Sequence, residues 1–226
     1  MKRAAFFVEG LTEAIFLQRL LEEIIGKRHL VFRFAEQKFG RVVFAAPSTV
    51  ELATYEILIV NCCNDDQVKS RIIEERERLI VAGYSLIVGI RDVYPADATA
   101  IPYLRRFLHH RLPTSGIKIE MILAVMEIEA WFISEHTHFQ RISPTLTTEA
   151  IQASVGFDIQ LIDVETIACP ADTLHLIYSV AGMAYHKTRS HFQRTVDELD
   201  IAEIYWNKSS SVPALGHLVS VIDGFI

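Results

Sequence analysis

Short apolar runs alternate with helical patterns through the first 130 residues, and this alternation constrains the fold more than any other feature. Between the runs, apolar residues recur at three-to-four spacing over residues 12–25, 68–81 and 101–112. Strands that alternate with helices indicate a mostly parallel sheet covered by helices on both faces. We therefore expect an α/β fold, with strands at residues 4–8, 30–34, 41–46, 57–60, 84–90 and 117–125.

The pattern changes after about residue 133. Helical patterns then follow one another without strands, and Pro144, Pro170 and Pro213 lie near helix starts. We predict an α/β core over residues 1–133 and a C-terminal helical cap over residues 134–226 that packs on it as part of one compact unit. The helices of the cap are expected at residues 147–155, 171–181, 191–199 and 212–222.

Composition excludes several classes of protein. The 226 residues carry 22 Lys and Arg against 28 Asp and Glu, a net charge of −6, which argues against a strongly basic nucleic-acid-binding protein but leaves room for a local basic stretch. No apolar run approaches the roughly 18 residues that span a bilayer. Three cysteines without a CxxC pattern form no disulfide framework or zinc site. We expect a cytoplasmic protein without a membrane segment.

Acidic residues follow three of the predicted strands. Glu9 ends the first, Asp92 follows the run at 84–90, and Glu127 and Glu129 follow the last. In parallel sheets, ligands bind at the carboxyl ends of the strands. Carboxylates gathered there repel one another unless a cation neutralises them, and oxygen ligands suit Mg²⁺ or Mn²⁺. The alternative is that each acid is an ordinary solvated loop residue.

The same residues carry a resemblance to a known family. The sequence EGLTE at residues 9–13 resembles the E-G-x-T-E opening of Toprim domains in the OLD-family (overcoming lysogenization defect) nucleases. Residues 87–97 lie where the Asp-x-Asp strand of such domains is expected, and residues 126–132 resemble the last acidic motif of a family of small uncharacterised Toprim-like proteins. The stretch with Tyr185 and Lys187 also has a counterpart there.

The resemblance implies Mg²⁺- or Mn²⁺-dependent cleavage of nucleic acid, most readily DNA, or another phosphoryl transfer. Glu9 would be a metal ligand or general acid/base, Asp92 the central ligand, and Lys187 a catalytic lysine that steadies charge on the phosphate. One departure is Tyr94, which stands at the second aspartate of Asp-x-Asp; Asp97 is a possible substitute. The remaining metal ligands would be Glu13, Glu127 and Glu129, in one or two metal sites.

Relatives in the OLD family often work beside an ATPase. This chain has no P-loop, so the resemblance implies a separate ATPase subunit and a role in defence against phage; an oligomer is also possible. The alternative function is a binding or regulatory subunit on a degenerate Toprim-like fold, which Tyr94 favours. A phospho-acceptor receiver domain fits poorly, because that fold needs paired acids after its first strand.

A basic stretch follows the Asp92 strand. No acid interrupts residues 102–118, and the i, i+4 spacing of its arginines and histidines places two positive ridges on one helix. Such a stretch could bind a phosphate backbone, although an ordinary solvated helix face is the plain alternative. Zinc binding at residues 135–138 (EHTH) is not expected, because the HExxH spacing is absent. The predicted nucleic-acid-binding residues are Arg105, Arg106, His109, Arg111 and Lys118.

Overall fold

The chain forms two compact units. The computed structural model describes residues 1–38, 41–44, 53–63 and 67–226. Unit 1 comprises Met1–Asp92, Pro102–Leu123 and Val221–Ile226, and unit 2 comprises Val93–Ile101 and Ala124–Ser220. None of the helices in this described part combines the length and the apolar character that crossing a membrane requires.

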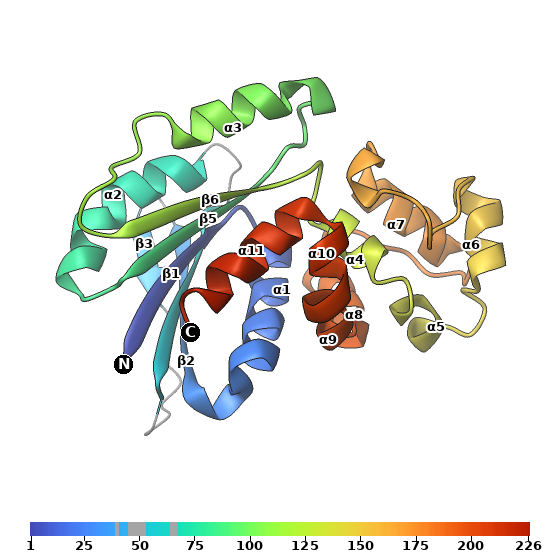
Figure 1. Cartoon of the computed structure of the whole chain (residues 1–226). Coiled ribbons are helices and arrows are strands. Elements are labelled where there is room, and N and C mark those ends of the chain that lie inside the picture. The colour runs from blue at the N-terminus through green and yellow to red at the C-terminus, as the bar shows by residue number, and fades with distance from the viewer. Residues whose placement is uncertain (39–40, 45–52, 64–66) are drawn as a thin grey trace. The chain divides into compact units, whose positions relative to one another are not determined.

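Unit 1 is built on a six-stranded sheet with the order β3-β2-β4-β1-β5-β6 (Figure 1). Five of the strands are parallel, and β3 runs antiparallel to β2 at one edge. This arrangement confirms the expected α/β class with a mostly parallel sheet. The strands are β1 (Lys2–Val8), β2 (Leu30–Lys38), β3 (Arg41–Phe44), β4 (Tyr55–Asn61), β5 (Leu86–Asp92) and β6 (Lys118–Ala124).

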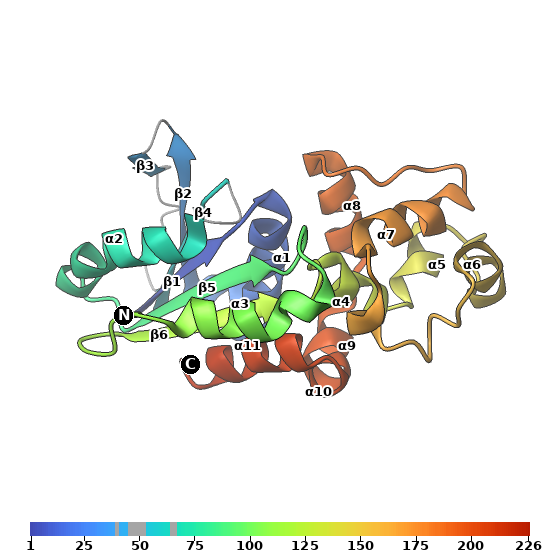
Figure 2. The same cartoon turned by 90° about the horizontal axis from the view of Figure 1, so that it is seen from above.

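Helices cover both faces of the sheet. In Figures 1 and 2, α1 (Leu11–Leu21) lies on one face, and α2 (Val68–Val81) and α3 (Ile101–His109) lie on the other. The covering helix α2 approaches β5 closely at Gly89: a Cβ there would lie 2.6 Å from Met121 Sδ and 2.8 Å from Ile72 Cδ1. Only glycine fits without displacing these side chains, which explains a glycine inside a buried strand.

The strand register brings the carboxyl ends of β1, β4 and β5 to one edge. Phe7 is level with Val60 of β4 and with Gly89 of β5. The centre of the sheet is fully apolar, and Phe6, Ile57 and Val88 are almost completely buried. Apolar runs buried on both faces are typical of parallel strands. The residues that follow these runs, including Glu9, therefore meet at one edge.

Unit 2 is helical and has its own core, which includes Trp131, Phe139 and Tyr178, all fully buried. Residues 93–101, the first segment of unit 2, are attached to its second segment by backbone hydrogen bonds from Val93 N to Ala124 O (3.0 Å) and from Tyr94 N to Met126 O (2.8 Å). Its helices are α4 (Glu129–Ser134), α5 (His138–Ile142), α6 (Thr148–Val155), α7 (Pro170–Ser179), α8 (Arg189–Glu198), α9 (Ile201–Glu203), α10 (Ser209–Ser211) and α11 (Pro213–Asp223), the last of which ends in unit 1.

Three expectations about the chain are corrected. The predicted boundary after residue 133 differs from the observed division, because the hydrogen bonds from residues 93 and 94 attach that segment to the start of the helical unit. The first helix, expected from residue 12, begins at Leu11 with Gly10 as its N-cap, and it continues into a π-helical turn at Glu22–Gly26. The third helix ends at His109. Residues 45 and 46 of the expected strand at 41–46 lie outside the described residues.

Candidate functional site

Two carboxylates lie at the carboxyl edge of the sheet in unit 1. Glu9 directly follows β1, and Asp92 is the last residue of β5, the strand that pairs with β1. Both side chains belong to buried residues, with 7% and 6% of their surface exposed. Burial of two acids on adjacent strands is costly unless positive groups or a cation compensate them. This edge is therefore the strongest candidate site in unit 1.

Arg91 supplies positive charge to Glu9. Its Nε lies 3.8 Å from Glu9 Oε1, and both side chains are largely buried. The register explains the pairing. Phe7 of β1 is level with Gly89 of β5, and Glu9 and Arg91 each lie two residues after these positions. The sequence pattern did not identify Arg91 as a partner of Glu9, because the pairing depends on the register of β1 against β5.

Glu13 has a structural role in the first helical turn. Its Oε2 accepts a hydrogen bond from Gly10 N at 2.9 Å, which satisfies an amide at the start of α1. The residue is buried, and a Cβ at Gly10 would lie 3.2 Å from the same oxygen. The glycine thus permits the close approach of Glu13 to the backbone. Through this contact Glu13 caps the N-terminus of its own helix.

Cys62 lies near the same edge and is not suited to be a nucleophile. It follows β4, and its N donates to Val8 O at 2.8 Å. Burial raises the pKa of its thiol to about 12, with Arg71 opposing the shift and the charge of Glu9 adding to it. A thiol with this pKa stays protonated at neutral pH and is unreactive.

The remaining predicted metal ligands and the predicted catalytic lysine lie in unit 2, where Glu127 is held from two sides. Its Oε1 accepts a hydrogen bond from Lys187 Nζ at 2.8 Å, and its Oε2 accepts one from Ala171 N at 2.9 Å, in the first turn of α7. The carboxylate is nearly fully buried, whereas about half of the Lys187 side chain is exposed. The pair borders a cavity of about 360 Å³ lined by Tyr94, Glu127, Cys169, Ala171, Asp172, Tyr185, His186 and Lys187.

Glu129 lies in the first turn of α4 and is also held within unit 2. Its Oε1 accepts a hydrogen bond from the hydroxyl of Tyr185 at 2.9 Å, and both residues are buried. Tyr185 and Lys187 therefore each bond one of the two acids in the MEIEAWF stretch. These four residues, which the resemblance singled out, thus form two direct contacts inside unit 2.

Asp97 is exposed and caps a short 3₁₀ turn. Its Oδ1 accepts hydrogen bonds from the N and the hydroxyl of Thr99, and these bonds lower the pKa of its carboxyl group. The structure thus places Asp97 in unit 2 and Asp92 in unit 1, with Tyr94 beside the unit 2 cavity. Within the described residues, no group of three or more His, Cys, Asp or Glu side chains is arranged to hold a metal ion.

The predicted basic residues lie mostly on one helix. Arg105, Arg106 and His109 are exposed on α3, and Arg111 is exposed just beyond its end, with a positive φ of 57°. Lys118 lies on β6 instead and pairs with Glu120 at 3.3 Å. Its charge is therefore compensated locally, and the basic surface is the α3 segment.

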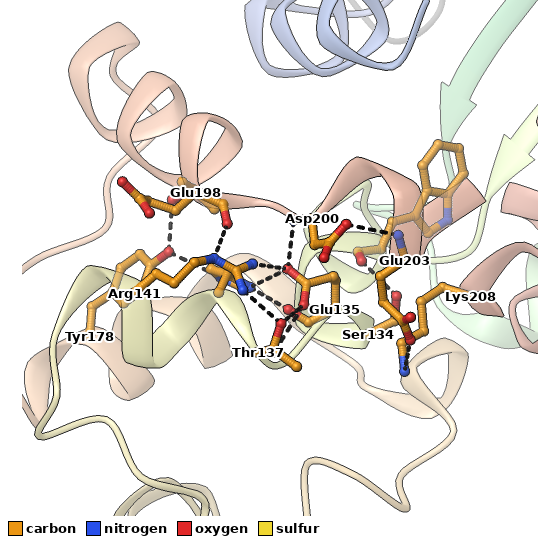
Figure 3. A network of polar contacts seen from close by, with 12 residues as sticks. Ser134, Glu135, Thr137, Arg141, Tyr178, Glu198, Asp200, Glu203 and Lys208 are labelled. Carbon is orange, nitrogen blue, oxygen red and sulfur yellow. Dashed lines mark hydrogen bonds and ion pairs between the residues drawn. The ribbon is translucent and has the colours of Figure 1, made fainter. Parts of the chain in front are cut away.

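A third buried acid of unit 2, Glu135, organises part of its core (Figure 3). Its Oε2 accepts hydrogen bonds from Arg141 at 2.9 Å and from Asp200 N at 3.0 Å, and its Oε1 accepts one from Thr137 N at 3.0 Å. Glu135 is fully buried, so each bond offsets the loss of water around its charge. The EHTH stretch is a structural network that joins α5 to the segment between α8 and α9.

Comparisons with known proteins add information about the fold only. No family model and no curated protein matches the chain. Among solved structures, the chain is similar to a hypothetical protein, PH0156, from Pyrococcus horikoshii OT3, with a TM-score of 0.51 and 13% sequence identity over 100% of this chain and 99% of that one. At this identity the likeness supports the fold of the whole chain and says nothing about its chemistry.

Proposed function

We propose that this protein is a Toprim-like enzyme that cleaves phosphodiester bonds of nucleic acid, most readily DNA, with the help of Mg²⁺ or Mn²⁺. One observation carries the proposal: Glu9 and Asp92 are buried acids at the carboxyl ends of two adjacent parallel strands. This edge is where ligands bind in sheets of this type. The resemblance of residues 9–13 to the opening of Toprim domains supports the same position.

The donors at this edge fit one ion better than two. Mg²⁺ is commonly held by one or two carboxylates while it keeps several waters, and Glu9 and Asp92 supply that number. Glu13 is engaged at Gly10, which argues against a larger set in unit 1. A bound Mg²⁺ would polarise a phosphodiester oxygen and lower the pKa of a coordinated water. As a ligand or general base, Glu9 would share its carboxylate with Arg91, whose Nε lies 3.8 Å from Oε1.

Two further parts of the proposal rest on the resemblance. Lys187 would steady negative charge on the phosphate, and a separate ATPase subunit would activate cleavage in a defence system against phage. Lys187 is half-exposed beside a cavity in unit 2, so its ammonium group can reach a ligand there. The basic residues of α3 would contribute to holding the nucleic acid.

A plasmid-nicking assay tests the proposal. The wild type and Asp92→Asn are compared at equal concentration with Mg²⁺, Mn²⁺ or EDTA, and Asp197→Asn, an exposed aspartate of α8, serves as the matched control. We expect metal-dependent nicking that falls at least about 100-fold in Asp92→Asn and is unchanged in Asp197→Asn. Cleavage that persists in EDTA, or that Asp92→Asn leaves unchanged, would contradict the assigned site.

The second candidate is a binding or regulatory subunit without catalysis. It is favoured by Arg91, which already neutralises Glu9 at the site where a cation would act. Arg91 and Asp92 are also consecutive residues of β5, and consecutive side chains of a strand point to opposite faces. Asp92 is therefore directed away from the face on which Arg91 contacts Glu9. This candidate predicts nucleic-acid binding that neither EDTA nor Asp92→Asn changes, and no nicking under any metal.

A further inference from the structure

Two aromatic rings are exposed side by side on α3. Tyr103 and Phe107 are 61% and 43% exposed, and their rings stack with centroids 6.2 Å apart and an interplanar angle of 20°. The same helix is anchored by Leu104 and Leu108, which are buried. Because the core positions of the helix are already filled, the two rings are not needed to hold α3 in place.

Positive side chains lie along one side of this pair. Positions three and four apart are neighbours on a helix, so Arg106 lies next to Tyr103, and His110, just past the last turn, continues the row beyond Phe107. Arg105 and His109 form the ridge next to that of Arg106 and His110. In the described part of the chain, Arg105, Arg106 and Arg111 form no ion pair with an acid, and no acid occurs between residues 98 and 118. Such local positive charge stands out in a chain of net charge −6.

A lysine of α2 fixes the end of the helix that carries the rings. Lys69 Nζ donates hydrogen bonds to the carbonyl oxygens of Phe107 and His110, and it lies 4.4 Å from the centroid of the Phe107 ring. The ring is therefore held by a cation–π contact while much of the residue stays exposed. A ring that is already ordered loses little conformational entropy when a ligand stacks on it.

We propose that the exposed surface of α3 binds single-stranded nucleic acid, with the rings of Tyr103 and Phe107 beside Arg106, and with Arg105 further round the helix and Arg111 beyond its end. Unpaired bases would stack on the two rings, and the arginines would contact phosphates. Stacked aromatic rings beside basic residues are the arrangement that single-strand-binding proteins use. A duplex buries the faces of its bases, so it cannot use the rings. The inference deepens the proposed function by naming the form of its substrate, but binding at α3 requires neither a metal nor Asp92.

Fluorescence anisotropy with a labelled 20-residue oligothymidylate in EDTA tests the rings. The variants are Tyr103→Ala with Phe107→Ala, and Tyr103→Leu with Phe107→Leu, the second of which keeps an apolar surface without π faces. We expect each double variant to bind at least about tenfold more weakly than the wild type, because each stacked base contributes about 1–3 kcal/mol. Trp206→Ala, which removes a 72% exposed aromatic residue of unit 2, should leave binding unchanged.

The same assay repeated across salt concentrations tests the arginines. Each phosphate contact on a single strand contributes about 0.7 to the slope of log K against log salt, so Arg105→Gln with Arg106→Gln should reduce the slope by about 1.4. The matched control is Arg78→Gln on α2, since that arginine is exposed and paired with Glu75. Far-UV circular dichroism verifies that every variant is folded.

Three outcomes overturn the inference. The first is wild-type affinity in both ring variants, and the second is tighter binding of a 20-base-pair duplex than of the oligothymidylate. The third is a wild-type dimer that the ring variants convert to monomers while no oligonucleotide binds, which would make α3 a contact between copies of the chain. Ring-dependent binding without metal-dependent nicking would uphold this inference and contradict cleavage by the chain alone. Nicking without ring-dependent binding would overturn this inference and uphold the proposed cleavage.

Discussion

Arg91 Nε and Glu9 Oε1 lie 3.8 Å apart, at the ends of two adjacent parallel strands. The guanidinium group thus lies beside the carboxylate that the proposed chemistry assigns to a metal ion. A fixed cation at this position stabilises the fold when no metal is bound and competes with a metal when one is present. Substitution of Arg91 can therefore distinguish the proposed metal-dependent nuclease from a binding or regulatory subunit without catalysis.

Replacing Arg91 by methionine should destabilise the protein and make its stability depend on metal. Loss of a largely buried partner leaves the Glu9 charge poorly compensated, and we expect a cost of about 3 kcal/mol in EDTA. If the edge binds Mg²⁺, an ion at 100 times its dissociation constant restores about 2.7 kcal/mol. Urea unfolding with Mg²⁺ or EDTA measures both effects. Arg78→Met, at an exposed pair, should change stability by less than about 0.5 kcal/mol under either condition. Failure of Mg²⁺ to stabilise Arg91→Met would favour the binding subunit.

In unit 2, Glu127 should contribute more to stability than Lys187 does. Glu127→Ala removes the acceptor of both Lys187 Nζ and Ala171 N, and we expect it to cost about 2–3 kcal/mol. Lys187→Met removes only a half-exposed donor and should cost about 1 kcal/mol.

The coupling energy between Glu127 and Lys187, from a double-mutant cycle, should be close to 1 kcal/mol. The pair Lys27–Glu22, 3.2 Å apart with an exposed lysine, is the control and should couple by less than about 0.5 kcal/mol. Zero coupling between Lys187 and Glu127 would show that their contact is not formed in solution.

The architecture could be predicted from the sequence because hydrophobic periodicity reports burial directly. The pattern over residues 68–81 predicted α2 with both of its ends, and the aliphatic run at 57–60 lies inside β4. The boundaries of α1 and α3 were less predictable. The side chain of Glu13 accepts a hydrogen bond from Gly10 N at the start of α1, and Arg111 adopts a positive φ just after α3. Such endings depend on single contacts that no periodicity reveals.

The candidate site was less predictable than the fold, because a list of acids does not say which cations they meet. Glu9 was singled out as a metal ligand, yet its contact with Arg91 depends on the register of two strands far apart in sequence. Glu127 and Glu129 were grouped with it by their position after a strand, whereas their observed partners, Lys187 and Tyr185, lie almost 60 residues away in unit 2. Partners at such separations follow from tertiary packing and not from local pattern.

Stability should fall in mild acid because of His138. Burial is the main cause that lowers the pKa of this fully buried imidazole to about 3. A bond with the carbonyl oxygen of Glu135 opposes the shift, and the charges of Arg141 and His136 add to it. Below the ordinary value of about 6.5, the unfolded chain takes up a proton that the folded protein does not, so stability is complete above pH 6.5 and is lost toward pH 3. The contribution is about 1.4 kcal/mol per pH unit.

Urea midpoints at pH 7, 6, 5 and 4 measure this loss. His138→Gln removes the titrating group, so it should lower stability at pH 7 and reduce the dependence on pH by up to one proton. His29→Gln, at an exposed histidine, should leave the dependence on pH as in the wild type. A His138→Gln variant with the full acid dependence would show that another buried group is responsible.

Gly216 should resist the substitution that usually stabilises a helix. In the interior of α11, alanine is normally preferred over glycine by about 1 kcal/mol. Here, a Cβ at Gly216 would lie 2.3 Å from the carbonyl oxygen of Ser209, a backbone atom that cannot rotate away as a side chain can. We expect Gly216→Ala to cost about 2–3 kcal/mol through forced displacement of the backbone. Ser220→Ala, at an exposed position of the same helix, should be neutral or slightly stabilising. Thermal unfolding compares the two variants, and a rise in the melting temperature of Gly216→Ala would show that the close approach of α11 to Ser209 is absent.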